Sequence, residues 1–145
     1  MLKGISHVVS PELMMVLMKM GHGDELVIAD GNFPADSNAQ RIVRCDGHSA
    51  TVMLDEIVRL MPLDTYVDYP AAVMQHLDPA APEPPIWSQF RELMKRHEGR
   101  EIAVQQVERF EFYERAKRAY AIVATSETAL YANLILSKGV VLEHA

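Results

Sequence analysis

Short apolar runs alternate along this chain with segments in which apolar residues recur at helical spacing. Such runs are typical of buried strands, and the periodic segments are typical of helices that pack on a sheet. The predicted strands span residues 25–30, 40–45, 66–74, 104–109, 121–125 and 132–136. The predicted helices span residues 10–20, 49–61, 86–97 and 112–119. This alternation predicts an α/β fold in three α/β/α layers, with helices covering a central, mostly parallel sheet.

One stretch interrupts the alternation because it is rich in proline. Residues 78–85 carry four of the eight prolines, which are incompatible with a helix interior or a central strand. Neither half of the chain that flanks this stretch has enough apolar sequence to close a core alone. We therefore expect a loop at about 78–85 within a single domain that spans residues 1–145.

The first predicted helix is apolar on most of its faces. Ser10 is a favourable N-cap, Pro11 suits the first helical position, and Gly21 supplies the C-terminal stop. A helix that is apolar nearly all round is buried on more than one side, in a core or against another subunit. Its methionines, among nine in the chain, indicate adaptable packing.

The overall composition narrows the classes of partner. Of the 145 residues, 49% are hydrophobic and 23% are charged, which is typical of a globular domain and not of a disordered chain. The net charge of −6 disfavours nucleic acid and anionic membranes and suits a neutral or cationic ligand. No apolar run has the length of a membrane span or the pattern of a signal peptide, so we expect a cytoplasmic protein.

Several kinds of chemistry are disfavoured by what the sequence lacks. Cys45 is the single cysteine, which excludes an intramolecular disulfide and a multi-cysteine metal site, and its apolar surroundings predict a buried, unreactive thiol. A metal site built from His22, Asp24 and Asp30 is conceivable, but no HxH, HxxxH or HExxH spacing supports it. The chain has no glycine-rich phosphate loop and no GxSxG elbow, so nucleophilic catalysis is disfavoured.

The most suggestive single residue is His22, which stands between Gly21 and Gly23 before the first predicted strand. Flanking glycines leave an imidazole sterically uncrowded, and an accessible imidazole can take and return a proton near neutral pH. The alternative is a polar loop histidine after a helix that simply ends at Gly21. The spacing alone leaves both interpretations open.

Three further candidates lie where predicted strands end or begin, and each also has a purely structural explanation. Asp30 could bind a sugar hydroxyl, orient His22 or cap the following turn. Arg109, at the end of the 104–109 strand, could bind a ligand or pair with the neighbouring glutamates. Tyr131 and Asn133 alternate along an extended segment, so they would face one side and offer the neutral donors and acceptors that a polyol needs.

In its motifs the sequence resembles the L-fucose mutarotase / D-ribose pyranase family. The first matching motif is Met20-Gly21-His22-Gly23-Asp24-Glu25, followed by Asp30 with Phe33-Pro34. The block 109–116, which reads Arg-Phe-Glu-Phe-Tyr-Glu-Arg-Ala, resembles the fucose mutarotase branch. Further matches are residues 1–6, 10–13, 121–127, 131–136 and 138–140. Only residues 78–100 have no counterpart, so the resemblance covers nearly the whole chain.

This resemblance implies a ribose-pyranase-like fold and a cofactor-independent isomerase that interconverts the α and β anomers of L-fucose or a related monosaccharide. It implies that His22 is the catalytic proton donor, that no metal is used, and that the other site residues bind the sugar. Those residues are Asp30, Arg109, Tyr131, Ala132 and Asn133. It also implies a homo-oligomeric ring, often a decamer, with pockets at subunit boundaries. The methionine-rich first helix is our candidate for that boundary.

Two positions depart from the family pattern. Ala132 stands where fucose mutarotases usually have glycine, and Gly31-Asn32 replaces a small residue followed by histidine. We expect both positions to border the sugar pocket and to influence which sugar it takes. The alternative functions are a non-catalytic monosaccharide-binding protein accessory to transport, pyranose/furanose interconversion of D-ribose, and a metal-dependent sugar isomerase.

Overall fold

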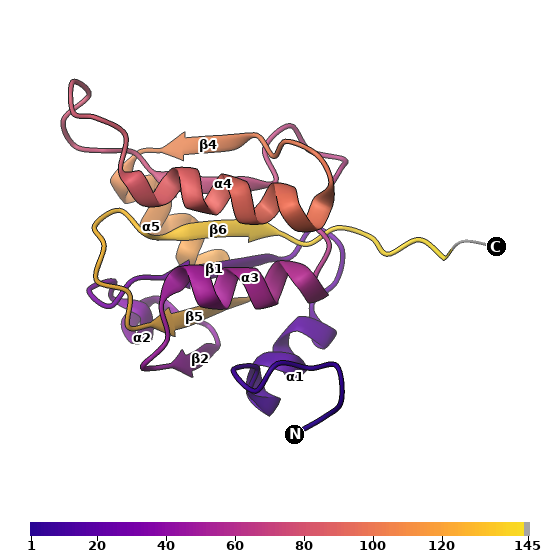
Figure 1. The fold of residues 1–145 in the computed structure, drawn as a ribbon. Helices are drawn as coiled ribbons and strands as arrows, with labels where there is room; N and C mark the ends of the chain where they lie inside the picture. The colour runs from indigo at the N-terminus through magenta and orange to yellow at the C-terminus, as the bar shows by residue number, and fades with distance from the viewer. Residues whose placement is uncertain (144–145) are drawn as a thin grey trace.

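Six strands form one sheet in the computed structural model, which describes residues 1–143 (Figure 1). The strands are β1 Glu25–Ala29, β2 Ile42–Cys45, β3 Ala71–Met74, β4 Val104–Val107, β5 Ala121–Thr125 and β6 Leu134–Ser137. Their spatial order is β2-β5-β1-β6-β3-β4, and only β6 runs antiparallel to its neighbours. The predicted mostly parallel sheet is confirmed.

Helices cover both faces of this sheet. In Figure 1 the helices α3 and α4 lie in front of the sheet, and α2 and α5 lie behind it. Along β1, Leu26 and Ile28 belong to the core on the α3/α4 side, while Val27 and Ala29 belong to the core on the α5 side. The predicted three-layer α/β/α architecture is therefore confirmed. The helices are α1 Pro11–Lys19, α2 Ala35–Asn38, α3 Ala50–Leu60, α4 Pro85–Glu98 and α5 Arg109–Arg118.

Some predicted boundaries were wrong, for identifiable reasons. The predicted strand 66–74 shrinks to β3, which begins after Pro70, because proline has no N–H to donate to a sheet. The predicted strand 104–109 ends at Val107, since Glu108 caps the next helix three residues earlier than expected. The short helix α2 was not predicted, and β6 begins at Leu134 instead of residue 132.

The proline-rich segment connects β3 with α4 and extends beyond the sheet at the upper left of Figure 1, as the predicted loop. It ends where Pro85 occupies the first turn of α4. At the other end of α4, Gly99 adopts a left-handed conformation with φ 73°, which closes the helix.

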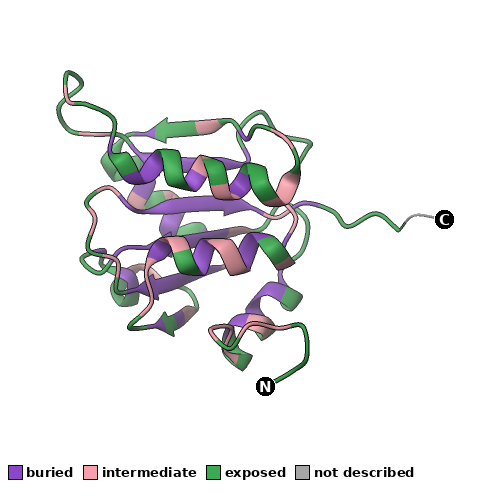
Figure 2. Cartoon of the chain, in the orientation of Figure 1, coloured by how far each residue is buried: buried purple, intermediate pink, exposed green. Residues whose placement is uncertain are grey.

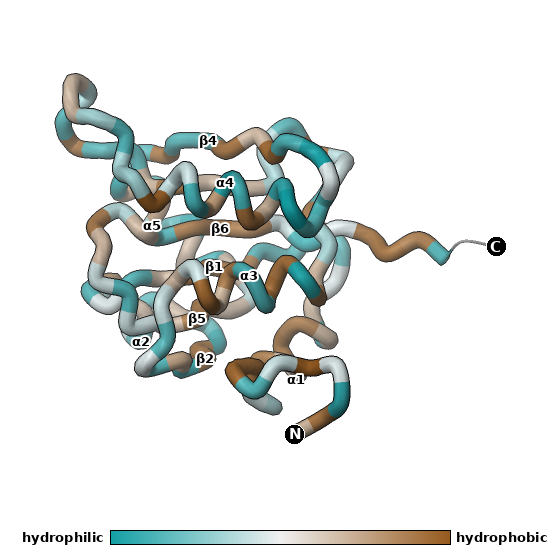
Figure 3. The backbone as a smooth tube through the Cα atoms, in the orientation of Figure 1, coloured by the Kyte–Doolittle hydropathy of each residue, from teal (hydrophilic) through white to brown (hydrophobic). Residues whose placement is uncertain are grey.

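The first helix has one buried and one exposed apolar face. Leu13, Val16 and Leu17 enter the core, while Met15 and Met18 are exposed. The ribbon of α1 accordingly carries both buried and exposed colours in Figure 2. The brown, hydrophobic stretches of the N-terminal segment and of residues 140–142 also lie at the surface in Figure 3. Together with α1, the N-terminal segment lines an apolar groove of about 690 Å³.

Cys45 is buried at the end of β2, as predicted. Burial, together with the negative charge of Asp46, raises the pKa of its thiol to about 11, so the reactive thiolate is scarce at neutral pH. Within residues 1–143 no helix combines the length and apolarity needed to cross a membrane.

Candidate functional site

A cavity of about 250 Å³ opens at the edge of the sheet where β1 ends and β6 begins. Its lining includes four of the six predicted site residues, namely Asp30, Arg109, Tyr131 and Asn133. The other lining residues are Asn32, Phe33, Pro34, Met74, Leu77, Tyr113 and Leu130. Because β6 is antiparallel, its first residues lie at the same edge as the carboxyl end of β1. We call this cavity the edge pocket.

Asp30 and Asn133 form a buried pair at the base of the edge pocket. The backbone N–H of Asp30 donates to Asn133 Oδ1 over 2.8 Å, and Asn133 Nδ2 donates to Asp30 Oδ2 over 3.2 Å. Asp30 Oδ1 also accepts from the N–H of Asn32, so Asp30 caps the following turn, which was one of the three alternatives for this residue. Burial raises the pKa of Asp30, against the lowering effect of these hydrogen bonds. The pair presents fixed oxygen and nitrogen atoms to the cavity.

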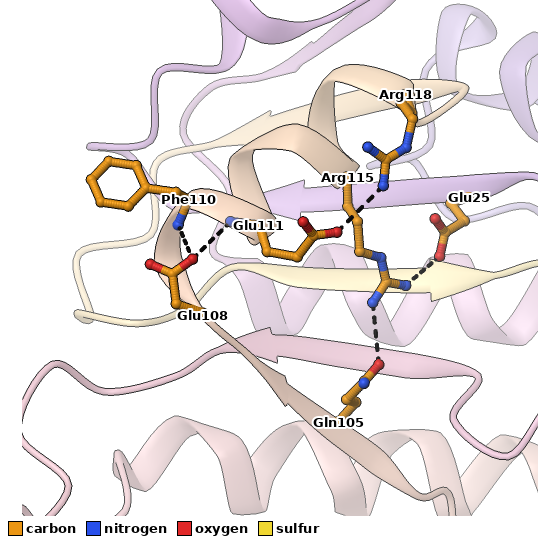
Figure 4. Close-up of polar contacts among 7 residues, drawn as sticks. All are labelled: Glu25, Gln105, Glu108, Phe110, Glu111, Arg115 and Arg118. Atoms are coloured by element: carbon orange, nitrogen blue, oxygen red, sulfur yellow. Dashed lines mark hydrogen bonds and ion pairs between the residues drawn. The ribbon is translucent and has the colours of Figure 1, made fainter.

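The first turn of α5 is held by its N-cap residue. The Glu108 carboxylate accepts from the N–H groups of Phe110 and Glu111, each over 3.0 Å (Figure 4). Further along the helix, Arg115 donates to Glu25 at the start of β1 and to Gln105 on β4 (Figure 4). These contacts fix α5 against the sheet and therefore fix the position of Arg109.

Arg109 lies in that first turn and reaches the edge pocket. The glutamates that could have paired with it are otherwise engaged, since Glu111 pairs with Arg118 and Glu114 with Lys117. Within residues 1–143 the structure contains no salt bridge to Arg109, whose guanidinium lies 5.8 Å from the ring centre of Tyr113. An exposed guanidinium beside a cavity can donate hydrogen bonds to ligand oxygens.

Tyr131 and Ala132 depart from the expected extended strand. Tyr131 has φ 56°, so the predicted alternation of Tyr131 and Asn133 along a strand is wrong, although both side chains border the pocket. Ala132 is fully buried in the core on the α3/α4 side and does not line the edge pocket. The expectation that position 132 borders the sugar pocket is therefore wrong. Asn32, which belongs to the second position where the sequence departs from the family pattern, does line the edge pocket.

His22 lies at the opposite edge of the sheet from the edge pocket. It precedes β1 while Asp30 follows it, and a five-residue strand spans about 16 Å. Asp30 therefore does not orient His22 within one chain, and these residues cannot share a metal with Asp24. Accordingly, among residues 1–143 no group of three or more His, Cys, Asp or Glu side chains is placed to hold a metal.

The partner of His22 is Asp64, which sequence reasoning missed. His22 Nε2 lies 3.0 Å from Asp64 Oδ1, and the imidazole packs at a tilt against Tyr66, with ring centres 5.2 Å apart. The carboxylate side chain is 3% exposed and the imidazole 46%. A neutral imidazole that donates Nε2–H to a carboxylate keeps a lone pair on Nδ1, which makes Nδ1 the proton acceptor. Asp64 follows a loop proline and belongs to no motif, so no sequence signal marked it.

The Asp64 carboxylate is stabilised in its charged form. Burial alone would raise its pKa, but hydrogen bonds from the N–H of Tyr66 and from His22 outweigh that effect and lower it below the ordinary value of 3.8. The backbone of Asp64 is also held, because its N–H donates to Ser137 at the end of β6 and its carbonyl accepts from Arg100. The orientation of His22 is therefore set by a rigid partner.

Lys138, the residue directly after β6, holds the turn that carries His22. Lys138 Nζ donates to the carbonyl oxygens of Leu17 and Met20, over 2.7 and 2.6 Å, at the C-terminal end of α1. Its own carbonyl accepts from Gly23, whose φ of 85° favours glycine. These contacts tie the end of α1, the His22 turn and β6 together.

Replacing Asp64 by asparagine is expected to lower the free energy of unfolding by about 1–3 kcal/mol at pH 5, because a buried charge-assisted hydrogen bond is lost. The folded-state pKa lies below 3.8, so the carboxylate stabilises the fold above that pH and loses this contribution as the pH falls through the folded pKa. Urea unfolding of both proteins between about pH 5 and pH 3 should show the difference shrinking. Asp68→Asn, on the exposed part of the same loop, is the control. A difference that stays constant over this range would contradict the assignment.

The family of the chain follows from its match to known proteins. The model of the "RbsD / FucU transport protein family" matches residues 3–141. The chain belongs to this family. One similar relative is the human "Fucose mutarotase", which is 51% identical over 146 residues that cover 96% of this chain and 94% of the relative.

Solved structures support the same RbsD / FucU fold. The fucose mutarotase of Streptococcus pneumoniae, solved in complex with L-fucose, superposes with a TM-score of 0.91 at 48% identity and covers 97% of this chain and 100% of its own. The Bacillus subtilis RbsD complexed with D-ribose superposes with a TM-score of 0.74 at 20% identity over 98% of this chain and 100% of its own, which shows the shared fold. The resemblance expected from the sequence motifs is confirmed.

Proposed function

We propose that this protein is a cofactor-independent fucose mutarotase that interconverts the α and β anomers of L-fucose by opening and reclosing the sugar ring. The observation that carries the proposal is the edge pocket, where Asp30, Arg109, Tyr131 and Asn133 converge from three parts of the chain. The 51% identity to the human fucose mutarotase supports L-fucose as the sugar. The free thiol of Cys45 fits a cytoplasmic location.

The chemistry requires one proton to leave the anomeric hydroxyl and another to reach the ring oxygen. His22 suits this exchange because Asp64 holds one ring nitrogen and leaves the other to receive and return a proton. In the edge pocket, the lone pairs and N–H groups left by the Asp30–Asn133 pair bind sugar hydroxyls. Arg109 stabilises negative charge that develops on the sugar oxygen.

The two parts of this site lie at opposite edges of one chain, so they meet only between copies. We propose that each edge pocket receives His22 from a neighbouring copy in a homo-oligomeric ring, with a decamer as the expected assembly. Exposed apolar side chains lie on the two segments that adjoin the His22 turn: Met18 on α1, and Val141 and Leu142 shortly after Lys138, whose carbonyl accepts from Gly23. Such surface is typical of a subunit boundary.

Saturation-transfer NMR of L-fucose tests the mutarotase function. The α/β exchange rate should rise in proportion to protein concentration, and a panel of other reducing sugars, including D-ribose, would establish the preference. The competing function is a monosaccharide-binding protein accessory to transport, which would give saturable binding in calorimetry with no faster exchange. That result would reject the mutarotase.

A further inference from the structure

Tyr131 adopts a backbone conformation that most favours glycine. Its φ of 56° is the only positive value among the non-glycine residues in the described part of the chain, 1–143. A side-chain-bearing residue remains in this region only when its surroundings hold it there. After Tyr131 the chain direction is fixed, because Ala132 is fully buried and Asn133 is bonded to Asp30.

Three contacts hold Tyr131, each at a different part of the residue. The indole Nε1–H of Trp87 donates to the carbonyl oxygen of Tyr131 over 2.8 Å. The imidazole of His76 stacks on the phenol ring, with ring centres 4.4 Å apart and an interplanar angle of 27°. The N–H of Leu77 donates to the phenol oxygen over 3.3 Å. Backbone, ring face and hydroxyl are thus all restrained.

Trp87 and His76 both lie outside the edge pocket. Neither residue lines that cavity, whereas both line a separate cavity of about 350 Å³ beneath the proline-rich loop. His76 lies just after β3, and Trp87 lies in the first turn of α4 and is 4% exposed. A buried indole N–H needs a hydrogen-bond acceptor, and the acceptor of Trp87 is the Tyr131 carbonyl.

We propose that Trp87 and His76 are positioning residues that hold Tyr131 against the sugar in the edge pocket and so set the affinity for the monosaccharide. This inference rests on the proposed mutarotase function, since it assigns the edge pocket to the sugar. It gives the segment 78–85 a role: the loop joins the two residues that restrain Tyr131 without itself lining the pocket. The proton transfer at His22 is left untouched.

The test uses two variants, Trp87→Phe and His76→Leu. Phenylalanine keeps an aromatic side chain at position 87, and a leucine can be accommodated at position 76 because that position is half-buried. Each should raise the KM for L-fucose about three- to tenfold, the effect of one lost hydrogen bond or stacking contact, with kcat within about twofold of wild type. His48→Leu, on the connection between β2 and α3, is the matched control and should change neither constant.

A second comparison separates positioning from general structure. In a Tyr131→Ala background, His76→Leu and Trp87→Phe should raise KM no further, because the tyrosine side chain through which they act on the sugar is absent. Unchanged KM values in the single variants, or full additivity with Tyr131→Ala, would overturn the proposal. If the wild-type protein fails to exchange anomers, the mutarotase function falls, and the same variants are compared by the Kd for L-fucose in calorimetry.

Discussion

Replacing His22 by alanine is expected to lower the rate of L-fucose anomer exchange by about 10²- to 10⁴-fold, the usual contribution of a positioned acid/base group. The substitution removes one hydrogen bond to the buried Asp64 carboxylate, so the free energy of unfolding should fall by about 1–3 kcal/mol while the protein remains folded. Saturation-transfer NMR measures the exchange, and urea unfolding confirms that the variant is folded. Sugar binding in calorimetry should persist, because the edge pocket is intact.

The matched control is His48→Ala, a histidine on the connection between β2 and α3 that lies outside the edge pocket. It should retain the wild-type exchange rate. If His22→Ala exchanged anomers within about twofold of wild type while folded, the acid/base role assigned to His22 would be wrong.

Replacing Gly139 by alanine is expected to lower the free energy of unfolding by about 1–3 kcal/mol, because a new methyl group would be forced against packed backbone. A Cβ at this position would lie 2.5 Å from the carbonyl oxygen of Leu63 and 3.0 Å from the Cα atom of Asp64. Both atoms belong to a backbone segment that cannot rotate away. The segment must shift, and Asp64 shifts with it, so the anomer exchange rate should fall as well.

Gly21→Ala is the control for this substitution, since a Cβ there would meet only Asp24 Oδ2 at an ordinary 3.6 Å. Its urea unfolding curve should lie close to that of the wild type. A Gly139→Ala protein as stable and as active as the control would contradict the close approach between the end of β6 and the Leu63–Asp64 backbone.

The sequence predicts the layered architecture well because hydrophobic periodicity reports burial directly. All six strands and the four long helices were expected, and a core lies on each face of the sheet, as expected for a sheet that helices cover on both sides. The reversal of β6 left no such signal, because a fully buried antiparallel strand has the same apolar run as a parallel one. The reversal brings Asn133 beside Asp30, and sequence patterns could not reveal it.

The candidate site was predicted residue by residue but not in its arrangement. Asp30, Arg109, Tyr131 and Asn133 do converge, whereas Ala132 turns into the core. The pair between His22 and Asp64 joins residues 42 positions apart, and the restraint of Tyr131 by Trp87 joins positions 44 apart. Such contacts depend on the tertiary fold, and local spacing does not encode them.

The most direct test of a site shared between copies is a complementation experiment. His22→Ala and Asp30→Asn chains are each expected to be inactive alone. The isosteric asparagine at position 30 can still accept the hydrogen bond from the Asn32 N–H, so the turn after β1 is kept. When the two chains are co-expressed in equal amounts and purified together, random assembly places an intact His22 against an intact edge pocket at about one quarter of the boundaries. The mixture should therefore exchange L-fucose anomers at about one quarter of the wild-type rate. A mixture no more active than the two separate variants would contradict a site completed by a neighbouring copy.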